Sequence, residues 1–223
     1  MVVERLTADY SEAESYAVEF PVSLPDAYQK WWYYHEAQTW NTLTWMGYKL
    51  WKFPTDLWIY QEIIFELQPD LIIETGTAYG GSALYLAHLC DLMGRGRVLT
   101  IDIGGPHSLP DHERIWYVRG SSVDPSVIEH MPEIGKGKIL TCLDSDHSRD
   151  HVLRELQLYA PFSDYLIVED TNLNGVVRPN FGPGPREAVD EFLNSKVGAG
   201  WEHDTHRERL ALTANPGGYL RRK

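Results

Sequence analysis

The stretch DLIIETGTAYGGSALYLAHLCDLMG (residues 70–94) decides the fold of this chain. Residues 70–76 form a short apolar, β-rich run that ends at a glycine, which predicts a buried strand. Residues 80–94 place apolar side chains at helical spacing and stop at Gly94, as helices often do. A strand, a glycine turn and a helix in this order form the first unit of an alternating α/β fold.

The same alternation continues along the rest of the chain. Helical patterns cover residues 55–67, 124–131, 148–159 and 185–196, and strand patterns cover residues 97–103, 115–121, 138–144 and 164–170. Strands that alternate with such helices predict a mostly parallel sheet with helices on both faces. Residues 209–215 and the Gly-Gly-Tyr-Leu run after them predict an antiparallel hairpin at the C-terminal end. The predicted fold class is therefore α/β.

The first part of the chain is different, and we expect it to be a separate helical segment (1–54) in front of the α/β domain (55–223). Six of the eight tryptophans lie between residues 31 and 58, around the end of this segment, namely Trp31, Trp32, Trp40, Trp45, Trp51 and Trp58. One interpretation is a layer that packs on the sheet or on another subunit. The other is an aromatic wall over a binding cleft, because flat rings stack well on sugars and aglycones. The two interpretations are compatible.

Composition excludes several classes of function. The 223 residues carry a formal net charge of −12, which argues against a broad nucleic-acid surface. No apolar run approaches the roughly 18 residues that a membrane helix needs, and the N-terminal sequence lacks a signal-peptide pattern. Cys90 and Cys142 have no metal-type spacing, so we expect buried free thiols and a cytoplasmic protein.

Acidic residues follow most of the predicted strands. They are Glu74, Asp102, Asp144, Glu169 and Asp170. In open parallel sheets, ligands bind beyond the carboxyl ends of the strands, near the switch in strand order. Acidic residues at several such ends therefore predict one shared cleft.

The glycine turn ETGTAYGGS (residues 74–82) predicts close contact between backbone and ligand. Gly76 suits the tight turn, and Gly80 and Gly81 permit close approach. The spacing is neither the dinucleotide fingerprint nor a Walker A loop. Asp102 ends the next strand, where its carboxylate suits a ribose diol.

Together, the turn ETGTAYGGS and the strand ending in IDI resemble the first two motifs of the class I S-adenosylmethionine-dependent methyltransferases. The resemblance implies a Rossmann-like methyltransferase sheet, with the methionine part of the cofactor on the glycine turn, the ribose on Asp102 and the adenine near the third strand. The cofactor site implied in this way consists of Glu74, Gly76, Tyr79, Gly80, Gly81, Ser82, Asp102, Ser121 and Ser122.

The segment LDSDHS (143–148) and the dipeptide Glu169-Asp170 add a second chemistry. Neighbouring carboxylates repel each other, and a cation held by Asp144, Glu169 and Asp170 would relieve that repulsion. Hard oxygen ligands favour Mg²⁺ or a similar ion. A cation lowers the pKa of a bound hydroxyl, and His147, one turn beyond Asp144, is placed to act as the base.

This D-x-x-H pattern followed by E-D resembles the cephalosporin hydroxylase/rhamnosyl O-methyltransferase family. Residues 45–82 also resemble the W-x-G and K-x-P-x-D run of that family, and the likeness spans residues 45–220. It implies that Asp144, Glu169 and Asp170 hold the metal and that His147 is the catalytic base. Catechol-type relatives typically carry lysine at the position of His147, which favours a sugar hydroxyl as the acceptor.

The resulting hypothesis is a magnesium-dependent O-methyltransferase. It would methylate a rhamnosyl-type sugar or another vicinal diol of a glycosylated small molecule or natural product, and would act as a homo-oligomer. One alternative is an oxygenase or hydroxylase-type tailoring enzyme that uses His147, His151 and Asp144, since non-haem iron sites take two histidines and one carboxylate. Another is a non-catalytic cofactor-binding subunit.

Some residues near the predicted site also have ordinary structural interpretations. Asp146 suits a turn or helix cap better than a metal site, and Ser148 suits an N-cap. The Pro/Gly-rich residues 171–185 form either a plain connection or a lid. Arg178 in this stretch and Arg186 just after it are either surface residues or contacts for an acidic substrate group.

Overall fold

A computed structural model describes residues 23–105, 108–129, 137–175, 177–178 and 180–223. Its centre is a seven-stranded sheet in the order β5-β4-β3-β6-β7-β9-β8. The strands are β3 (Leu71–Thr75), β4 (Arg97–Asp102), β5 (Ile115–Arg119), β6 (Ile139–Leu143), β7 (Tyr165–Val168), β8 (Trp201–His203) and β9 (Tyr219–Arg222). The first five pair in parallel, whereas β9 runs antiparallel to β7 and to β8. The predicted mostly parallel α/β sheet with an antiparallel C-terminal pair is confirmed.

The predicted position of one hairpin strand is wrong. The partner of β9 is β8, and residues 209–215 contain no strand. Backbone amides of this segment donate hydrogen bonds to side chains instead of to a neighbouring strand. The Ala214 amide donates to Asp56 Oδ2 at 2.9 Å, and the Asn215 amide donates to Thr213 Oγ1 at 2.9 Å. Local bonds of this kind compete with a strand ladder. The segment is therefore a connection, exposed at residues 209–211 and buried at residues 213–215, and the Ala214 amide ties it to Asp56 in the first turn of α3.

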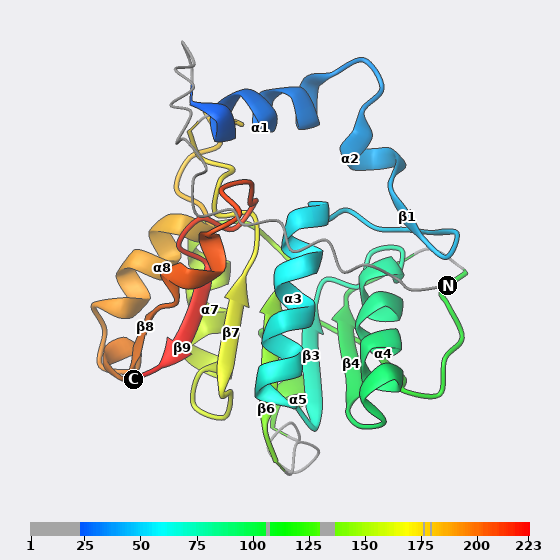
Figure 1. Ribbon diagram of the computed structural model, residues 1–223. Helices are drawn as coiled ribbons and strands as arrows, with labels where there is room; N and C mark the ends of the chain where they lie inside the picture. Colours follow the sequence, from blue (N-terminus) through cyan, green and yellow to red (C-terminus); the bar gives the residue numbers. More distant parts are fainter. Residues whose placement is uncertain (1–22, 106–107, 130–136, 176, 179) are drawn as a thin grey trace, which may run out of the picture.

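Helices cover both faces of the sheet, as predicted (Figure 1). One face carries α3 (Pro54–Leu67) and α4 (Gly81–Met93), and the other carries α5 (Pro125–Ile128), α7 (Arg149–Tyr159) and α8 (Pro185–Leu193). Successive strand residues point to opposite faces: Ile72 packs with α3 and α4, while Ile73 packs with α7 and α8. All five residues of β3 are buried, because helices cover both faces of the sheet. This explains why the strand begins with three consecutive apolar residues instead of alternating apolar and polar ones.

The helix boundaries follow local capping chemistry. Gly94 ends α4 in the left-handed conformation, with φ of 67°. Asp124 caps α5 by accepting a hydrogen bond from the Ser126 amide at 2.9 Å. Pro54 occupies the first position of α3, where its missing N–H costs nothing. The strand–turn–helix unit that the opening stretch predicts is therefore present between residues 71 and 93.

The described part of the N-terminal segment lies across the carboxyl ends of the strands. It contains α1 (Leu24–Tyr34), α2 (Thr39–Thr42) and the antiparallel pair β1 (Thr44–Trp45) and β2 (Tyr48–Lys49). Helix α1 lies above these strand ends in Figure 1. Trp32 of α1 packs against Phe53 and Ala214, with ring centroids of Trp32 and Phe53 4.8 Å apart. Residues 1–22, the rest of the predicted segment, lie outside the described residues.

Two smaller expectations can also be compared with the structure. Cys90 and Cys142 are both free and buried, as predicted. No helix among the described residues is long and apolar enough to cross a membrane. Two short 3₁₀ turns, Gly198–Gly200 and Thr205–Glu208, flank β8.

Candidate functional site

Two cavities open side by side at the carboxyl ends of the parallel strands. The larger has a volume of about 500 Å³ and lies over the ends of β3, β4 and β6. The smaller has a volume of about 210 Å³ and lies between α1, the end of β7 and the loop after it. Trp51, His147 and Asp170 line both cavities. The two spaces therefore meet at an aromatic ring, an imidazole and a carboxylate.

Part of the predicted cofactor site lines the larger cavity. These residues are Gly76, Asp102, Ser121 and Ser122. Asp102 Oδ2 accepts a hydrogen bond from the Ala78 amide at 3.0 Å, and Oδ1 accepts one from the Gly104 amide at 2.9 Å. The carboxylate at the end of β4 is thereby fixed against the glycine turn, with lone pairs left for a ligand. The cavity also lies where the strand order switches between β3 and β6, the usual ligand position in such sheets.

The other predicted cofactor residues lie behind or beside this cavity. Packing requires glycine at positions 80 and 81. A Cβ added to Gly80 would stand 2.6 Å from Pro110 Cδ, and one added to Gly81 would stand 2.1 Å from the carbonyl oxygen of Lys49. Tyr79 meets the ring of Trp51 edge-on at 5.0 Å.

Glu74 and Ser82 support the turn from below. Glu74 is buried within β3, where it accepts a hydrogen bond from Thr100 Oγ1 at 2.7 Å. Burial raises the pKa of Glu74, and the charge of Lys52 and a hydrogen bond from Ser82 oppose this effect. The roles of these residues toward a cofactor remain predictions.

Gly76 is required by the same crowding. Its φ is 89°, and an added Cβ would stand 2.0 Å from the carbonyl oxygen of Asp144. The end of β3 thus touches the end of β6 directly. This contact brings the glycine turn and the acidic segment after β6 into one site.

Asp144, His147 and Asp170 form a cluster whose potential ligand atoms lie within 4.8 Å of one another. His147 Nε2 lies 3.2 Å from Asp144 Oδ1 and 3.3 Å from Asp170 Oδ2. Burial lowers the pKa of His147, but its hydrogen bond to Asp144 and the negative charges of Asp170, Asp144 and Glu169 outweigh burial and raise the pKa to about 9. Without another cation, the imidazole is therefore protonated at neutral pH and bridges two carboxylates.

Lys52 is the residue of this site that the sequence analysis missed. Its Nζ lies 2.5 Å from Asp144 Oδ2 and 2.6 Å from Glu169 Oε2, and its side chain is only 4% exposed. Burial lowers the pKa of Lys52, but the charges of Asp144, Glu169 and Glu74 raise it well above its usual value. One signal in the sequence could have identified it: a lysine between Trp51 and Phe53, two residues before Pro54.

The cluster has the donor chemistry of a divalent-cation site. Glu169 Oε1 is buried and has no hydrogen-bond partner among the described residues. Burial and the charge of Asp144 raise the pKa of Glu169 well above its usual value, and burial also raises that of Asp170. Three carboxylates, Asp144, Glu169 and Asp170, here face two cationic side chains, Lys52 and His147. Carboxylate oxygens are the ligands that Mg²⁺ prefers, so the residues present fit such an ion.

The backbone holds Asp170 in an unusual conformation. Its φ is 54°, in the left-handed region that non-glycine residues seldom adopt. The Asp170 amide donates to Asn215 Oδ1 at 2.9 Å, and Tyr33 Oη donates to Asp170 Oδ1 at 3.4 Å. The segment before β9 and helix α1 thus both support this carboxylate. Strained backbone of this kind is often found where a side chain must point into a site.

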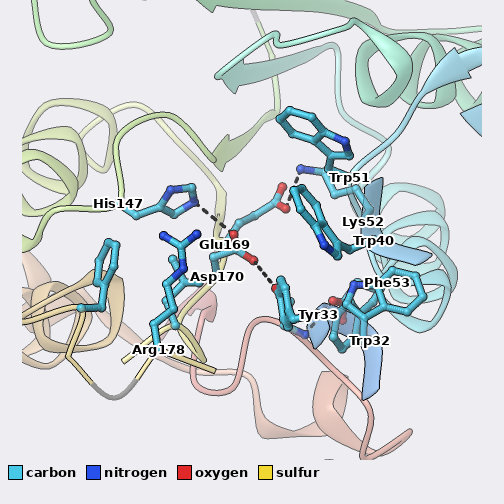
Figure 2. Close-up of a pocket in the computed structure, with 14 residues that line it drawn as sticks. Trp32, Tyr33, Trp40, Trp51, Lys52, Phe53, His147, Glu169, Asp170 and Arg178 are labelled. Atoms are coloured by element: carbon cyan, nitrogen blue, oxygen red, sulfur yellow. Dashed lines mark hydrogen bonds and ion pairs between the residues drawn. The ribbon is translucent and has the colours of Figure 1, made fainter. Parts of the chain in front are cut away.

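The smaller cavity has an aromatic wall, as one of the two interpretations of the tryptophan-rich segment predicted. Figure 2 shows these rings on one side of Glu169 and Asp170, and Arg178 on the other. Trp40 and Trp51 meet at 5.7 Å. Part of the segment also serves packing, because the buried Trp32 contacts Phe53 and Ala214. The wall consists of Trp32, Tyr33, Trp40, Trp51 and Phe53.

The remaining polar candidates have structural partners. Asp146 forms a turn, since its Oδ1 accepts a hydrogen bond from the Ser148 amide at 2.7 Å. Ser148 occupies the N-cap position of α7, although its side chain makes no capping hydrogen bond. His151 Nε2 lies 3.1 Å from the hydroxyls of both Ser122 and Ser145, in the larger cavity. His151 is therefore directed away from the cluster of Asp144 and His147 that the oxygenase alternative requires.

Of the two candidate arginines, Arg178 lies in the loop after β7 and Arg186 lies in helix α8. Arg178 lines the smaller cavity, together with Leu173 and Phe181. Arg186 instead pairs with Asp190 and donates to the Pro216 carbonyl oxygen at 2.9 Å. Arg178 is thus the arginine placed to meet a bound molecule.

Comparison with known proteins gives a consistent result. The family model described as Rhamnosyl O-methyltransferase/CmcI matches residues 37–223. A rhamnosyl O-methyltransferase of Mycobacterium bovis is 42% identical over 214 residues, which are 89% of this chain and 84% of that protein. The protein of the same name from Mycobacterium leprae is 41% identical over 212 residues, with coverages of 90% and 91%.

Among solved structures, CmcI with Mg and SAM shares the fold. The TM-score is 0.63 at 22% identity, and the match covers 82% of this chain and 77% of that one. The family match contains the whole of residues 45–220, over which the sequence motifs showed their resemblance. That resemblance is confirmed. The chain belongs to the rhamnosyl O-methyltransferase/CmcI family.

Proposed function

We propose that the chain is an S-adenosylmethionine-dependent O-methyltransferase that uses Mg²⁺ to methylate a hydroxyl of a sugar, of rhamnosyl type or another vicinal diol, in a glycosylated small molecule or natural product. The observation that carries the proposal is the meeting of the two cavities at Trp51, His147 and Asp170. Methyl transfer needs a donor and an acceptor in adjoining spaces with a base between them. Family membership and the CmcI structure with Mg and SAM support both the cofactor and the ion.

The larger cavity is the proposed cofactor site. Asp102, fixed at the end of β4, accepts hydrogen bonds from the ribose hydroxyls, and Gly76 lets the backbone approach the methionyl part. Ser121 and Ser122 lie where the adenine side is expected. Glu74, Tyr79, Gly80, Gly81 and Ser82 would act mainly by shaping the turn.

Asp144, Glu169 and Asp170 are the proposed metal ligands, and His147 is the proposed base. When bound, the cofactor supplies an electrophilic methyl group, and the cation lowers the pKa of a hydroxyl. His147 Nε2 lies beside Asp144 and Asp170 and faces both cavities. A cation bound there would disfavour the protonated imidazole, and the neutral ring could then accept the proton of an acceptor hydroxyl. The aromatic wall excludes water and orients the sugar ring through its apolar face.

A methyl-transfer assay tests the function directly. The protein, S-adenosylmethionine carrying a labelled methyl group and a panel of rhamnosylated and other glycosylated metabolites are combined, and labelled product is measured. We expect transfer to a sugar hydroxyl that EDTA abolishes and Mg²⁺ restores. Calorimetry that detects no S-adenosylmethionine binding would contradict the assignment of the cofactor. Transfer that continues in EDTA would contradict the assignment of the metal.

We further propose a homo-oligomer that acts in the cytoplasm, with the N-terminal segment as the cover of the site. Large apolar side chains, among them Trp58, Phe65 and Leu92, are exposed on the outer surfaces of α3 and α4 and are available for subunit contact. Light scattering coupled to size exclusion measures the mass of the assembly. A monomer at micromolar concentration would contradict the oligomeric part of the proposal.

A further inference from the structure

Lys52 has no role in the mechanism above, yet it lies at the centre of the acidic cluster. Its side chain is 4% exposed, and that of Glu169 is 5% exposed. The ammonium group contacts Asp144 Oδ2 at 2.5 Å and Glu169 Oε2 at 2.6 Å. Lys52 comes from the segment between β2 and α3, whereas the two carboxylates follow β6 and β7. One lysine thus connects three separate parts of the fold.

Lys52 Nζ contacts only one oxygen of each carboxylate, namely Asp144 Oδ2 and Glu169 Oε2. Asp144 Oδ1 faces His147, and Glu169 Oε1 is buried without a hydrogen-bond partner among the described residues. A buried carboxylate oxygen without a partner is costly unless a ligand supplies one. The ammonium group contacts neither of these oxygens: Glu169 Oε1 has no partner among the described residues, and Asp144 belongs with His147 and Asp170 to the cluster of potential ligand atoms.

The charge balance gives Lys52 a second effect. The buried or half-buried carboxylates around it are Glu74, Asp144, Glu169 and Asp170, and the cations among them are Lys52 and His147. Removal of one partner from a buried ion pair leaves an uncompensated charge, which is strongly destabilising. Lys52 thus allows the carboxylates to stay close together before any metal ion arrives.

We propose that Lys52 is a positioning residue for the cation site: its ammonium group holds Asp144 Oδ2 and Glu169 Oε2 together, and so leaves Asp144 Oδ1, which lies beside His147, and Glu169 Oε1 to a divalent cation. The inference rests on the proposed metal site. In this proposal, the ammonium group of Lys52 is a permanent positive charge of the site, and the divalent metal ion is a second, exchangeable one. Lys52 therefore determines how far the folded site depends on metal.

The test compares Lys52→Met with Lys49→Met in thermal unfolding, each with EDTA and with saturating Mg²⁺. Methionine keeps much of the volume of lysine and removes the charge. Lys49 is the matched control: it lies three residues earlier, bonds to Asn41 Oδ1 at 3.3 Å and lies over the ring of Tyr79, outside the acidic cluster. A magnesium titration by calorimetry accompanies the unfolding curves.

In EDTA, we expect Lys52→Met to lower the Tm by about 6–15 °C, as loss of a buried ion-pair partner predicts for a chain of this size. In Mg²⁺, the loss should fall to less than half, because the ion then supplies the missing positive charge. Lys49→Met should show the same small change in both conditions. An equal loss for Lys52→Met in EDTA and in Mg²⁺ would mean that Lys52 only packs, and would overturn the inference.

A double variant covers the case in which Lys52→Met does not fold. Lys52→Met combined with Glu169→Gln removes both charges of one pair, and it should recover most of the Tm in EDTA. A double variant that is as unstable as, or less stable than, the single variant would also overturn the inference. If the wild type itself shows no response to Mg²⁺, the proposed metal site fails, while the EDTA comparison of single and double variants still decides the role of Lys52.

Discussion

At the scale of single residues, His147 and its neighbours determine the chemistry of the site. The imidazole contacts Asp144 and Asp170 at 3.2 and 3.3 Å and faces both cavities. The same position would suit a metal ligand or a base. The cluster of potential metal-ligand atoms includes His147 but not Glu169. The family resemblance, in contrast, implied that Glu169 is a metal ligand and that His147 is the catalytic base. Variants can separate these two roles.

His147→Ala should lower kcat by about 10²- to 10⁴-fold, the usual contribution of a general base, while the affinity for S-adenosylmethionine stays unchanged. Affinity for Mg²⁺ should also stay unchanged if His147 is the base. Steady-state methyl transfer and calorimetric titrations of cofactor and ion measure the three quantities. Loss of magnesium affinity would assign His147 to the metal instead, and full activity would exclude it as the base.

Asp144→Asn should weaken magnesium binding by at least about 10-fold, since even outer partners of metal ligands contribute that much. Asp146→Asn is the matched control, because Asp146 lies two residues away and serves as a turn residue whose Oδ1 accepts from the Ser148 amide. Isothermal titration with Mg²⁺ compares the two. Equal magnesium affinities in both variants would remove Asp144 from the ligand set.

At the scale of elements, the start of α3 joins the site to the last strand of the sheet. Lys52 lies just before the helix, and Asp56 lies in its first turn. Asp56 Oδ2 accepts from the Ala214 amide at 2.9 Å, and Oδ1 accepts from Tyr219 Oη at 2.8 Å. The residues Lys52, Pro54 and Asp56 of the K-x-P-x-D run therefore have distinct tasks: an ion pair, a helix start and an anchor to β9.

The buried Asp56 should make stability depend on pH. Burial raises its pKa from 3.8 to about 6, although hydrogen bonds from Thr213, Ala214 and Tyr219 oppose the shift. The folded state therefore binds this proton more tightly than the unfolded state does. The contribution of Asp56 is fully present below pH 3.8 and is lost as pH rises through about 6.

Compared with Asp56→Asn, the wild type should thus lose about 1 to 1.5 kcal/mol of unfolding free energy between pH 5 and pH 8. Urea unfolding in EDTA at several pH values measures this difference, and the other titrating groups cancel between the two proteins. Parallel pH profiles of wild type and variant would contradict the raised pKa.

At the scale of the whole molecule, the N-terminal segment turns an open strand-end cleft into two adjoining cavities. Helix α1, which lies above the strand ends in Figure 1, lines the smaller cavity together with Trp40, whereas Gly76 and Asp102 line the larger one. Figure 2 shows Trp40 and Trp51 beside Glu169, which follows β7. Acceptor and cofactor binding should therefore be separable by mutation. In the proposed function, the aromatic wall belongs to the acceptor side.

Trp40→Leu should raise the KM for the sugar acceptor by about 2- to 10-fold, because an aromatic contact contributes about 0.5–1.5 kcal/mol. The affinity for S-adenosylmethionine should not change. Trp58→Leu is the matched control, since Trp58 is 61% exposed on α3 and lines neither cavity. A larger effect on the cofactor than on the acceptor would contradict the assignment of the two spaces.

The sequence by itself determined the order of strands and helices, the parallel sheet and the acidic residues at the strand ends. These features are local: apolar periodicity, caps and glycine turns act within a few residues, as Gly94 and Asp124 show. It also indicated the family through short motifs, and the comparisons confirmed this.

Only the tertiary structure decided what depends on contacts between distant segments. Residues 209–215 read as a strand, but hydrogen bonds to Asp56 and other side chains hold them as a connection. Gly81 reads as a ligand contact, but its lack of a Cβ is required by the Lys49 carbonyl oxygen. Lys52 reads as an ordinary charge, yet it is buried between Asp144 and Glu169, 92 residues or more away in sequence. Pairing over such separations has no local signature, because the free energy that fixes it comes from burial in the folded chain.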